Sequence, residues 1–116
     1  MKKPDEAIDR SPLSWMPKSV WGPIKWKELH ARALADLPME GEEKWFKEFV
    51  EGLPCPKCRH HFEDFVRLVP PNFSSRVAFF VWSVTAHNFV NDATKKKPMT
   101  IDQAYWNHAY LKDEEA

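Results

Sequence analysis

Two cysteines, Cys55 and Cys58, occupy a Cys-x-x-Cys spacing in the segment Pro54-Cys55-Pro56-Lys57-Cys58. On a helix, side chains at this spacing lie on the same side, close enough to form a disulfide or to supply half of a metal site. Because proline favours the first turn of a helix, Pro56 places both cysteines at a predicted helix N-terminus. Unpaired N–H groups and the positive end of the helix dipole stabilise a thiolate there, so the pattern indicates reactive thiols.

A metal site and a structural pair of thiols are the alternatives to redox chemistry. Zinc would require two further ligands, and the candidates are His60, His61, His87 and His108. No histidine pair has the spacing of a zinc finger, and no metal ligand is assigned. A thioredoxin-like fold would need strands around the cysteines, and the sequence predicts none. The choice between redox chemistry and zinc stays open at this point.

A second group of polar residues, His87, Asn88 and Asn91, interrupts a long apolar segment with a helical period. Asparagine is a poor residue inside a helix because its side chain competes for backbone hydrogen bonds. His87 and Asn91 share one helical face, which is typical either of a ligand site or of a buried histidine beside exposed asparagines. The lysines at 95–97 follow this segment and either cap the helix dipole or bind phosphate.

An aromatic residue and a histidine form the third candidate site. Trp26 and His30 are spaced so that they meet on one face of a helix that also carries Gly22. Such a pair can clamp a flat ring, or it can be part of the hydrophobic core. The pair alone does not decide between these two roles.

Helices must position all of these residues, because the apolar segments have a helical period and none alternates like a strand. The predicted fold is all-α, a four-helix bundle with a short fifth helix. The predicted apolar faces include Ile24 and Leu37 in the first helix, Val69 in the third and Val77 in the fourth. Capping residues, glycines and prolines set the expected limits at about 21–37, 40–51, 54–69, 74–93 and from Thr100 onward, with Tyr105, Trp106 and Tyr110 in the last helix.

Composition indicates one globular domain. Of the 116 residues, 43% are hydrophobic and 29% are charged, which suffices for a core and for solubility. The 17 basic and 17 acidic residues cancel, which argues against a nucleic-acid partner. The charged start has no apolar run behind it, so neither a signal peptide nor a membrane span is expected, and the expected location is cytoplasmic. Residues 1–18 are expected to form a flexible arm, 19–112 the domain and 113–116 a short acidic tail.

Taken in order, these motifs resemble the Erv/ALR family of FAD-linked sulfhydryl oxidases over 21–106. Each motif is weak alone, and the ordered series is specific. The motifs are Trp-Gly-Pro-x-x-Trp-x-x-Leu-His from Trp21 to His30, Pro-Cys-x-x-Cys from Pro54 to Cys58, His61-Phe62, Ser75-Arg76-x-x-Phe79-x-x-Trp82, His87-Asn88-x-Val90-Asn91, Lys97-Pro98 and Tyr105-Trp106.

The resemblance implies a helical bundle that encloses FAD and a thiol oxidase that forms disulfides in substrate proteins and passes electrons to O2, giving H2O2. It assigns Cys58 as the sulfur nearest the flavin and Cys55 as the sulfur that exchanges with substrate. It further implies a homodimer, thiol-containing protein substrates and, as an option, a thioredoxin-like carrier. By position, the residues implied to contact FAD are Gly22, Trp26, His30, His87, Asn88, Val90, Asn91, Lys95, Lys97 and Trp106.

The sequence departs from the family pattern in several places. Leu37 and Tyr105 replace a common tyrosine and a common basic residue, and the stretch 92–97 differs from the usual turn. No second cysteine pair exists, so Cys55 and Cys58 are expected to meet the substrate directly. An oxidase in a reducing cytosol would suit a dedicated set of clients, such as viral or phage proteins. Two rival hypotheses remain: a zinc-stabilised helical interaction module without oxidase activity, and a disulfide-exchange adaptor without flavin.

Overall fold

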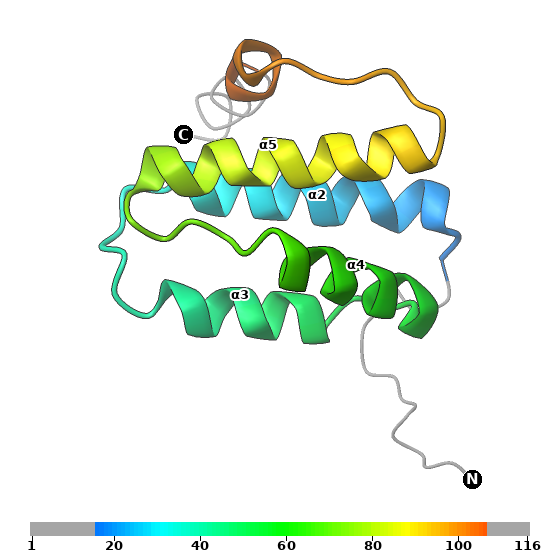
Figure 1. The fold of residues 1–116 in the computed structure, drawn as a ribbon, viewed down its shortest axis with the longest axis horizontal. Helices are drawn as coiled ribbons and strands as arrows, with labels where there is room; N and C mark the ends of the chain where they lie inside the picture. The colour runs from blue at the N-terminus through cyan, green and yellow to red at the C-terminus, as the bar shows by residue number, and fades with distance from the viewer. Residues whose placement is uncertain (1–15, 107–116) are drawn as a thin grey trace, which may run out of the picture.

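The computed structural model describes residues 16–106 and contains four long helices and a short helical segment at 101–106 (Figure 1). The helices are α2 (Lys18–Leu34), α3 (Glu42–Glu51), α4 (Pro56–Leu68) and α5 (Arg76–Ala93). Consecutive helices run in opposite directions, with α2 packed along α5 and α3 along α4. No residue in the described range is in a strand, so the predicted all-α fold is confirmed.

The limits of α2 differ from those predicted. The helix begins at Lys18 rather than at Trp21, because the carbonyl of Pro17 accepts hydrogen bonds from the N–H groups of Val20 and Trp21. The first turn is exposed and therefore carries no apolar period for a sequence pattern to detect. Pro23 consequently lies within the helix rather than in its first turn.

Local capping explains where the other helices begin and end. The side chain of Ser75 accepts a hydrogen bond from the N–H of Ala78, which satisfies an unpaired donor at the start of α5. Gly41 precedes α3 with a φ of 83°, a conformation that glycine adopts without steric cost. Gly52 ends α3, as its position in the sequence predicts.

The core lies between the α2–α5 pair and the α3–α4 pair and is largely aromatic. The rings of Phe46 and Trp82 meet edge to face at a centroid distance of 5.3 Å, and Phe62 packs against both. Four predictions of the apolar faces were wrong, because Ile24 is 45%, Leu37 42%, Val69 39% and Val77 72% exposed. Leu37 and Val69 lie just beyond the ends of α2 and α4, whereas Ile24 and Val77 lie on exposed faces of α2 and α5.

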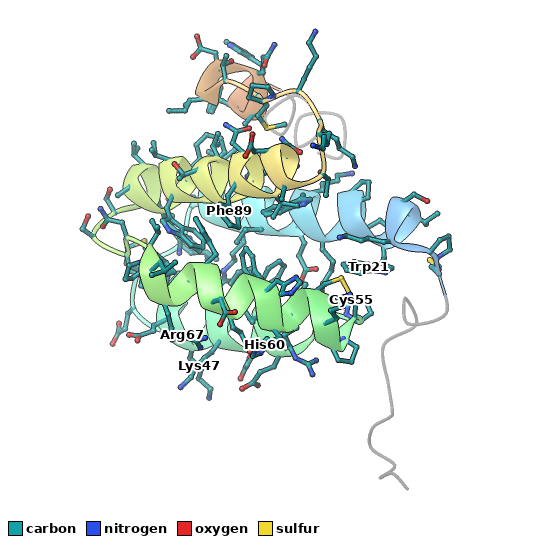
Figure 2. The ribbon with its side chains drawn as sticks, turned by 45° about the vertical axis from the view of Figure 1, so that its right-hand side comes forward. Trp21, Lys47, Cys55, His60, Arg67 and Phe89 are labelled. Carbon is teal, nitrogen blue, oxygen red and sulfur yellow. A yellow bond between two sulfur atoms is a disulfide. The ribbon has the colours of Figure 1, made fainter. Side chains whose placement is uncertain are left out.

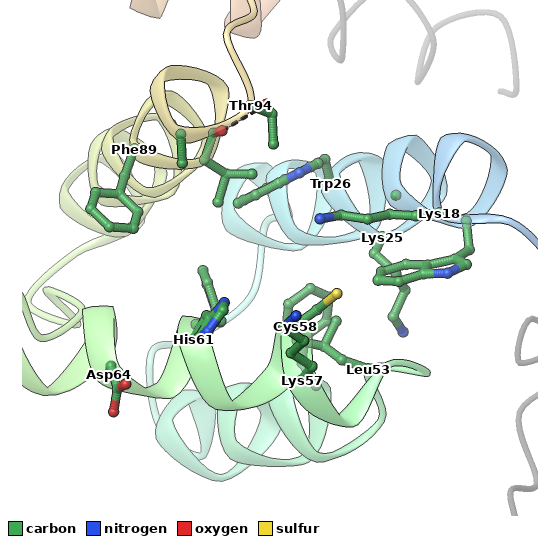
Figure 3. Close-up of a pocket in the computed structure, with 16 residues that line it drawn as sticks. Lys18, Lys25, Trp26, Leu53, Lys57, Cys58, His61, Asp64, Phe89 and Thr94 are labelled. Carbon is green, nitrogen blue, oxygen red and sulfur yellow. Dashed lines mark hydrogen bonds between the residues drawn. The ribbon is translucent and has the colours of Figure 1, made fainter.

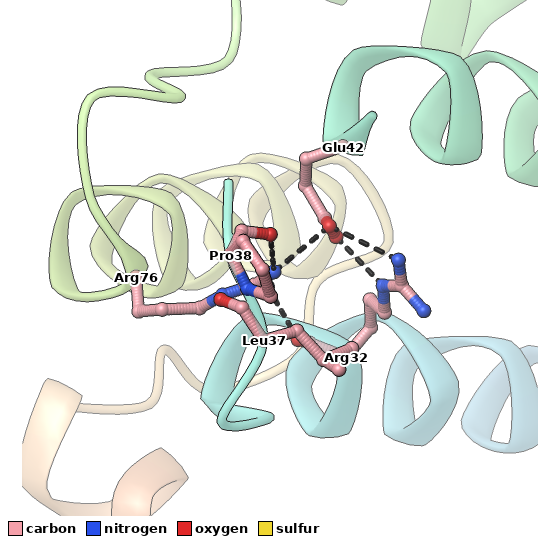
Figure 4. A network of polar contacts seen from close by, with 5 residues as sticks. All are labelled: Arg32, Leu37, Pro38, Glu42 and Arg76. Atoms are coloured by element: carbon pink, nitrogen blue, oxygen red, sulfur yellow. Dashed lines mark hydrogen bonds and ion pairs between the residues drawn. The ribbon is translucent and has the colours of Figure 1, made fainter. Parts of the chain in front are cut away.

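A polar network joins the ends of three helices at the end of the bundle where α2 finishes (Figure 4). The carboxylate of Glu42, which is fully buried, accepts hydrogen bonds from Arg32 and Arg76. Arg76 also donates to the backbone carbonyls of Arg32, Leu37 and Pro38. Burial raises the pKa of the Glu42 carboxyl, but the hydrogen bonds and charges of the two arginines outweigh it and lower that pKa below its ordinary value.

Several predictions concern residues outside the described range. Most of the predicted arm and the whole of the predicted tail at 113–116 lie outside it, as does Tyr110. Ala104 in the segment 101–106 is fully buried and attaches this segment to the core. No helix among the described residues is long and apolar enough to cross a membrane.

Candidate redox site

Cys55 and Cys58 form a disulfide at the start of α4, with their Cα atoms 5.2 Å apart. Cys55 is the N-cap residue of α4, Pro56 occupies its first turn, and the sulfur of Cys55 accepts a hydrogen bond from the N–H of Cys58 at 3.1 Å. The predicted placement of both cysteines at a helix N-terminus is therefore confirmed. When the disulfide is reduced, this N–H group and the helix dipole stabilise a thiolate at Cys55.

Arg59 holds the turn that carries the disulfide. Its guanidinium donates to the backbone carbonyls of Glu51 and Leu53 at 3.4 and 3.3 Å, at the end of α3. The carbonyl of Glu51 belongs to the negative end of the α3 dipole and that of Leu53 to the turn after it, so the cation satisfies both and ties α3 to α4. The disulfide is thus fixed relative to two helices.

A cavity of about 670 Å³ opens beside the disulfide, within the size range typical of small-molecule sites (Figure 3). Cys58 lines this cavity, and Cys55 does not. Figure 2 shows the disulfide and Trp21 at the same end of the bundle. Of the residues predicted to contact a cofactor, those that line the cavity are Gly22, Trp26 and Val90.

Two predicted residues, His30 and His87, lie behind Trp26. The rings of Trp26 and His87 are stacked, with a centroid distance of 4.2 Å and an interplanar angle of 5°. The Nε2 atom of His30 lies 3.0 Å from Nδ1 of His87, within hydrogen-bond distance. His30 is fully buried. Because His87 stacks on Trp26 and contacts His30, the two histidines support the indole that forms part of the cavity wall.

Asn88 and Asn91 hold the chain that follows α5. The side chain of Asn88 makes two hydrogen bonds of 2.8 Å with the backbone of Met99, accepting from its N–H and donating to its carbonyl. The amide of Asn91, which is buried, donates to the side-chain oxygen of Asn88 at 3.3 Å. The polar strip seen in the sequence therefore fixes the segment leading to residues 101–106.

Three predicted residues, Lys95, Lys97 and Trp106, are exposed and do not line the cavity. Trp106 is 66% exposed and packs against Tyr105. Lys95 follows the C-cap of α5 and has a φ of 63°, a left-handed conformation that turns the chain away from the helix. Their contact with a cofactor remains a prediction, as it does for the other predicted cofactor-binding residues.

Sequence reasoning missed part of the cavity wall. Lys25 is one such residue: its ammonium lies 5.0 Å from the centre of the Phe49 ring and it pairs with Glu28. The helical spacing of Trp21 and Lys25 could have revealed a shared face. The lining residues not singled out as contacts are Lys18, Trp21, Lys25, Phe49, Leu53, Lys57, His61, Phe62, Asp64, Phe89, Ala93 and Thr94.

The zinc hypothesis is also addressed by the geometry. Within residues 16–106, no three side chains of histidine, cysteine, aspartate or glutamate are grouped so that they could hold a metal ion. The two cysteines are bonded to each other rather than placed as separate ligands. The site is a disulfide beside a ligand-sized cavity in a helical bundle, which is the arrangement of a small redox protein.

Comparison with known proteins identifies the class further. The model of the Erv1 / Alr family matches residues 25–110, and the chain belongs to this family, as its motifs predicted. An FAD-linked sulfhydryl oxidase of African swine fever virus is 35% identical over 83 residues, which cover 66% of this chain and 70% of the viral protein. A probable FAD-linked sulfhydryl oxidase of Acanthamoeba polyphaga mimivirus is 33% identical over 94 residues, covering 72% of this chain and 65% of that protein. Both of these relatives are viral proteins.

Proposed function

We propose that this chain is an FAD-dependent thiol oxidase that forms disulfides in substrate proteins, with Cys55 and Cys58 as the redox-active pair. Family membership and the names of the viral relatives support the activity and the cofactor. The observation that supports the electron path is the position of the disulfide, because Cys58 lines the cavity and Cys55 lies outside its wall at the N-cap of α4.

The described residues fit the cofactor. The cavity is walled by aromatic rings, among them Trp26, Phe62 and Phe89, which suit a flat ring system. Lys18, Lys25 and Lys57 also line it and supply positive charge for a pyrophosphate. These residues would hold FAD beside Cys58, in addition to those that the family motifs assign. When bound, FAD supplies the two-electron acceptor that restores the disulfide and passes the electrons to O2, giving H2O2.

The chain's own residues carry the exchange of disulfides. A substrate thiolate attacks the sulfur of Cys55, forming a mixed disulfide and releasing Cys58 as a thiolate. A second substrate thiolate then attacks the substrate sulfur, which releases the product disulfide and leaves Cys55 as a thiolate. The N–H of Cys58, 3.1 Å from the Cys55 sulfur, stabilises this leaving group.

The visible spectrum of the purified protein tests this proposal first. A bound flavin whose absorbance bleaches with dithiothreitol and returns in air, with oxygen consumed, is the expected result. The released cofactor is identified by chromatography. A protein that stays colourless after incubation with FAD would contradict the proposed activity. Thiol exchange without oxygen consumption would instead favour a flavin-free adaptor.

Two further proposals concern the oligomeric state and the electron donor. We propose a homodimer, because Val20 and Ile24 on α2 are each 45% exposed and offer apolar surface to a second copy. Sedimentation of wild type and of Ile24→Glu tests this, with loss of the dimer expected in the variant.

We also propose a thioredoxin-like protein as an alternative donor, since the chain has only two cysteines and no second pair to relay electrons. Reduction of the flavin by such a protein under anaerobic conditions tests that role.

A further inference from the structure

Ser83 is a fully buried polar residue in the middle of α5, beside the two histidines that support Trp26. Its hydroxyl lies 2.6 Å from the carbonyl oxygen of Phe80 and 2.8 Å from Nδ1 of His30. Neither the family motifs nor the cavity lining includes this serine. Its contacts nevertheless connect it to the cavity wall in three steps.

The hydroxyl of Ser83 has a single proton, and the carbonyl of Phe80 can only accept. Two oxygen atoms 2.6 Å apart would repel each other without a proton between them, so the hydroxyl donates to Phe80. The serine oxygen must then accept a hydrogen bond from Nδ1–H of His30. Full burial of His30 disfavours its charged form, which leaves Nε2 of this ring as an acceptor.

The same logic extends to the next ring. Because Nε2 of His30 accepts, Nδ1 of His87 must carry the proton that bridges the 3.0 Å between them. His87 is in turn stacked on Trp26, almost parallel to it. The chain of contacts therefore runs from the carbonyl of Phe80 through one hydroxyl and two imidazoles to the indole in the cavity wall.

We propose that Ser83 is a positioning residue of the redox site, which sets the Nδ1–H tautomer of both His30 and His87 and thereby holds Trp26 in the wall of the cofactor cavity. The role of this wall in FAD binding rests on the proposed function, whereas the tautomers do not. Because the chain of donors ends at a carbonyl, it orients the rings and does not conduct a proton.

The test compares Ser83→Ala with Thr85→Ala in the full-length protein. Thr85 is a matched control, since its hydroxyl also donates to a carbonyl of α5, that of Val81, and it is exposed. Imidazole ¹⁵N chemical shifts distinguish the two tautomers, and single His30→Asn and His87→Asn variants assign the signals. FAD affinity of the apoprotein is measured by fluorescence titration.

In wild type, both histidines are expected as neutral Nδ1–H tautomers. Ser83→Ala should change the His30 tautomer and raise the Kd for FAD by about fivefold, the effect of losing one hydrogen bond, while Thr85→Ala changes neither. Rescue of both readouts by Ser83→Thr, which restores the hydroxyl, would support the assignment further.

Nε2–H tautomers in wild type, or tautomers unchanged in Ser83→Ala, would overturn the proposal. A changed tautomer with unchanged FAD affinity would overturn the positioning role. If wild type failed to bind FAD at all, the proposed function would fail, and the ¹⁵N shifts would still decide whether Ser83 sets the tautomers.

Discussion

The two ends of the helical bundle differ in how their polar groups are arranged. At the closed end, formed by Arg32, Glu42 and Arg76, a buried carboxylate is paired with two guanidiniums, and Arg76 also binds backbone carbonyls there (Figure 4). At the redox end, formed by the Cys55–Cys58 disulfide and its cavity, the helices separate enough to leave about 670 Å³ (Figure 3). The same four helices are thus locked together at one end and open to a ligand at the other.

This difference follows from the direction of the helices. The N-termini of α3 and α5 meet the C-terminus of α2 at the closed end, so an acidic and a basic side chain each find complementary partners there. The N-terminus of α4 lies at the redox end, where its dipole stabilises a thiolate instead. Stability and chemistry should therefore respond to separate sets of substitutions.

Replacement of Cys58 should have the largest effect, and it should affect activity alone. Cys58→Ser removes the sulfur that lines the cavity, and oxygen consumption with dithiothreitol should fall at least about 10⁴-fold, as is typical when a catalytic nucleophile is removed. Far-ultraviolet circular dichroism should stay unchanged. His60→Ser, on the exposed side of the same helix, is the control and should keep its turnover. Substantial activity in Cys58→Ser would refute the assignment of the redox pair.

Replacement of Glu42 should have the converse effect. Glu42→Ala leaves Arg32 and Arg76 without their common partner, and the free energy of unfolding should fall by about 3 kcal/mol. Urea denaturation of the apoprotein measures this loss. Glu43→Ala, at the exposed neighbouring position, should cost no more than about 0.5 kcal/mol. Equal losses in the two variants would show that the closed end is not a distinct source of stability.

The sequence predicted the redox end better than the closed end, because the former depends on neighbours in the chain. A helix start and a reactive pair are both indicated within a few residues, by Cys55, Pro56 and Cys58. Glu42 has no such signal, since it stands among other acidic residues and its partners are 10 and 34 positions away. Ser83 was missed for the same reason, because its contact with His30 spans 53 positions.

Asn88 offers a smaller test at the redox end, where its side chain holds the segment that follows α5. Asn88→Ala removes two hydrogen bonds to the backbone of Met99, so the free energy of unfolding should fall by about 1–2 kcal/mol. Amide hydrogen exchange at Met99 should become faster. Asp92→Ala, an exposed position one turn further along α5, serves as the control. Lower FAD affinity with unchanged exchange at Met99 would show instead that Asn88 acts by contacting the cofactor.

The dependence of stability on acid should distinguish the closed end from the redox end through a variant that keeps the size of the Glu42 side chain. The arginines hold the pKa of Glu42 below 4.5, its ordinary value, which it regains in the unfolded chain. The unfolded state therefore binds more protons in this range, and the stabilisation is present above pH 4.5 and is lost as the pH falls through the lower pKa of the folded state.

Glu42→Gln lacks this titration, so its stability should fall less steeply with acid than that of wild type in urea denaturation from pH 6 down to about pH 3. The disulfide at the redox end does not titrate, so it contributes nothing to the wild-type slope. Parallel curves for wild type and Glu42→Gln would mean that the two arginines do not favour the ionised carboxylate over the neutral one.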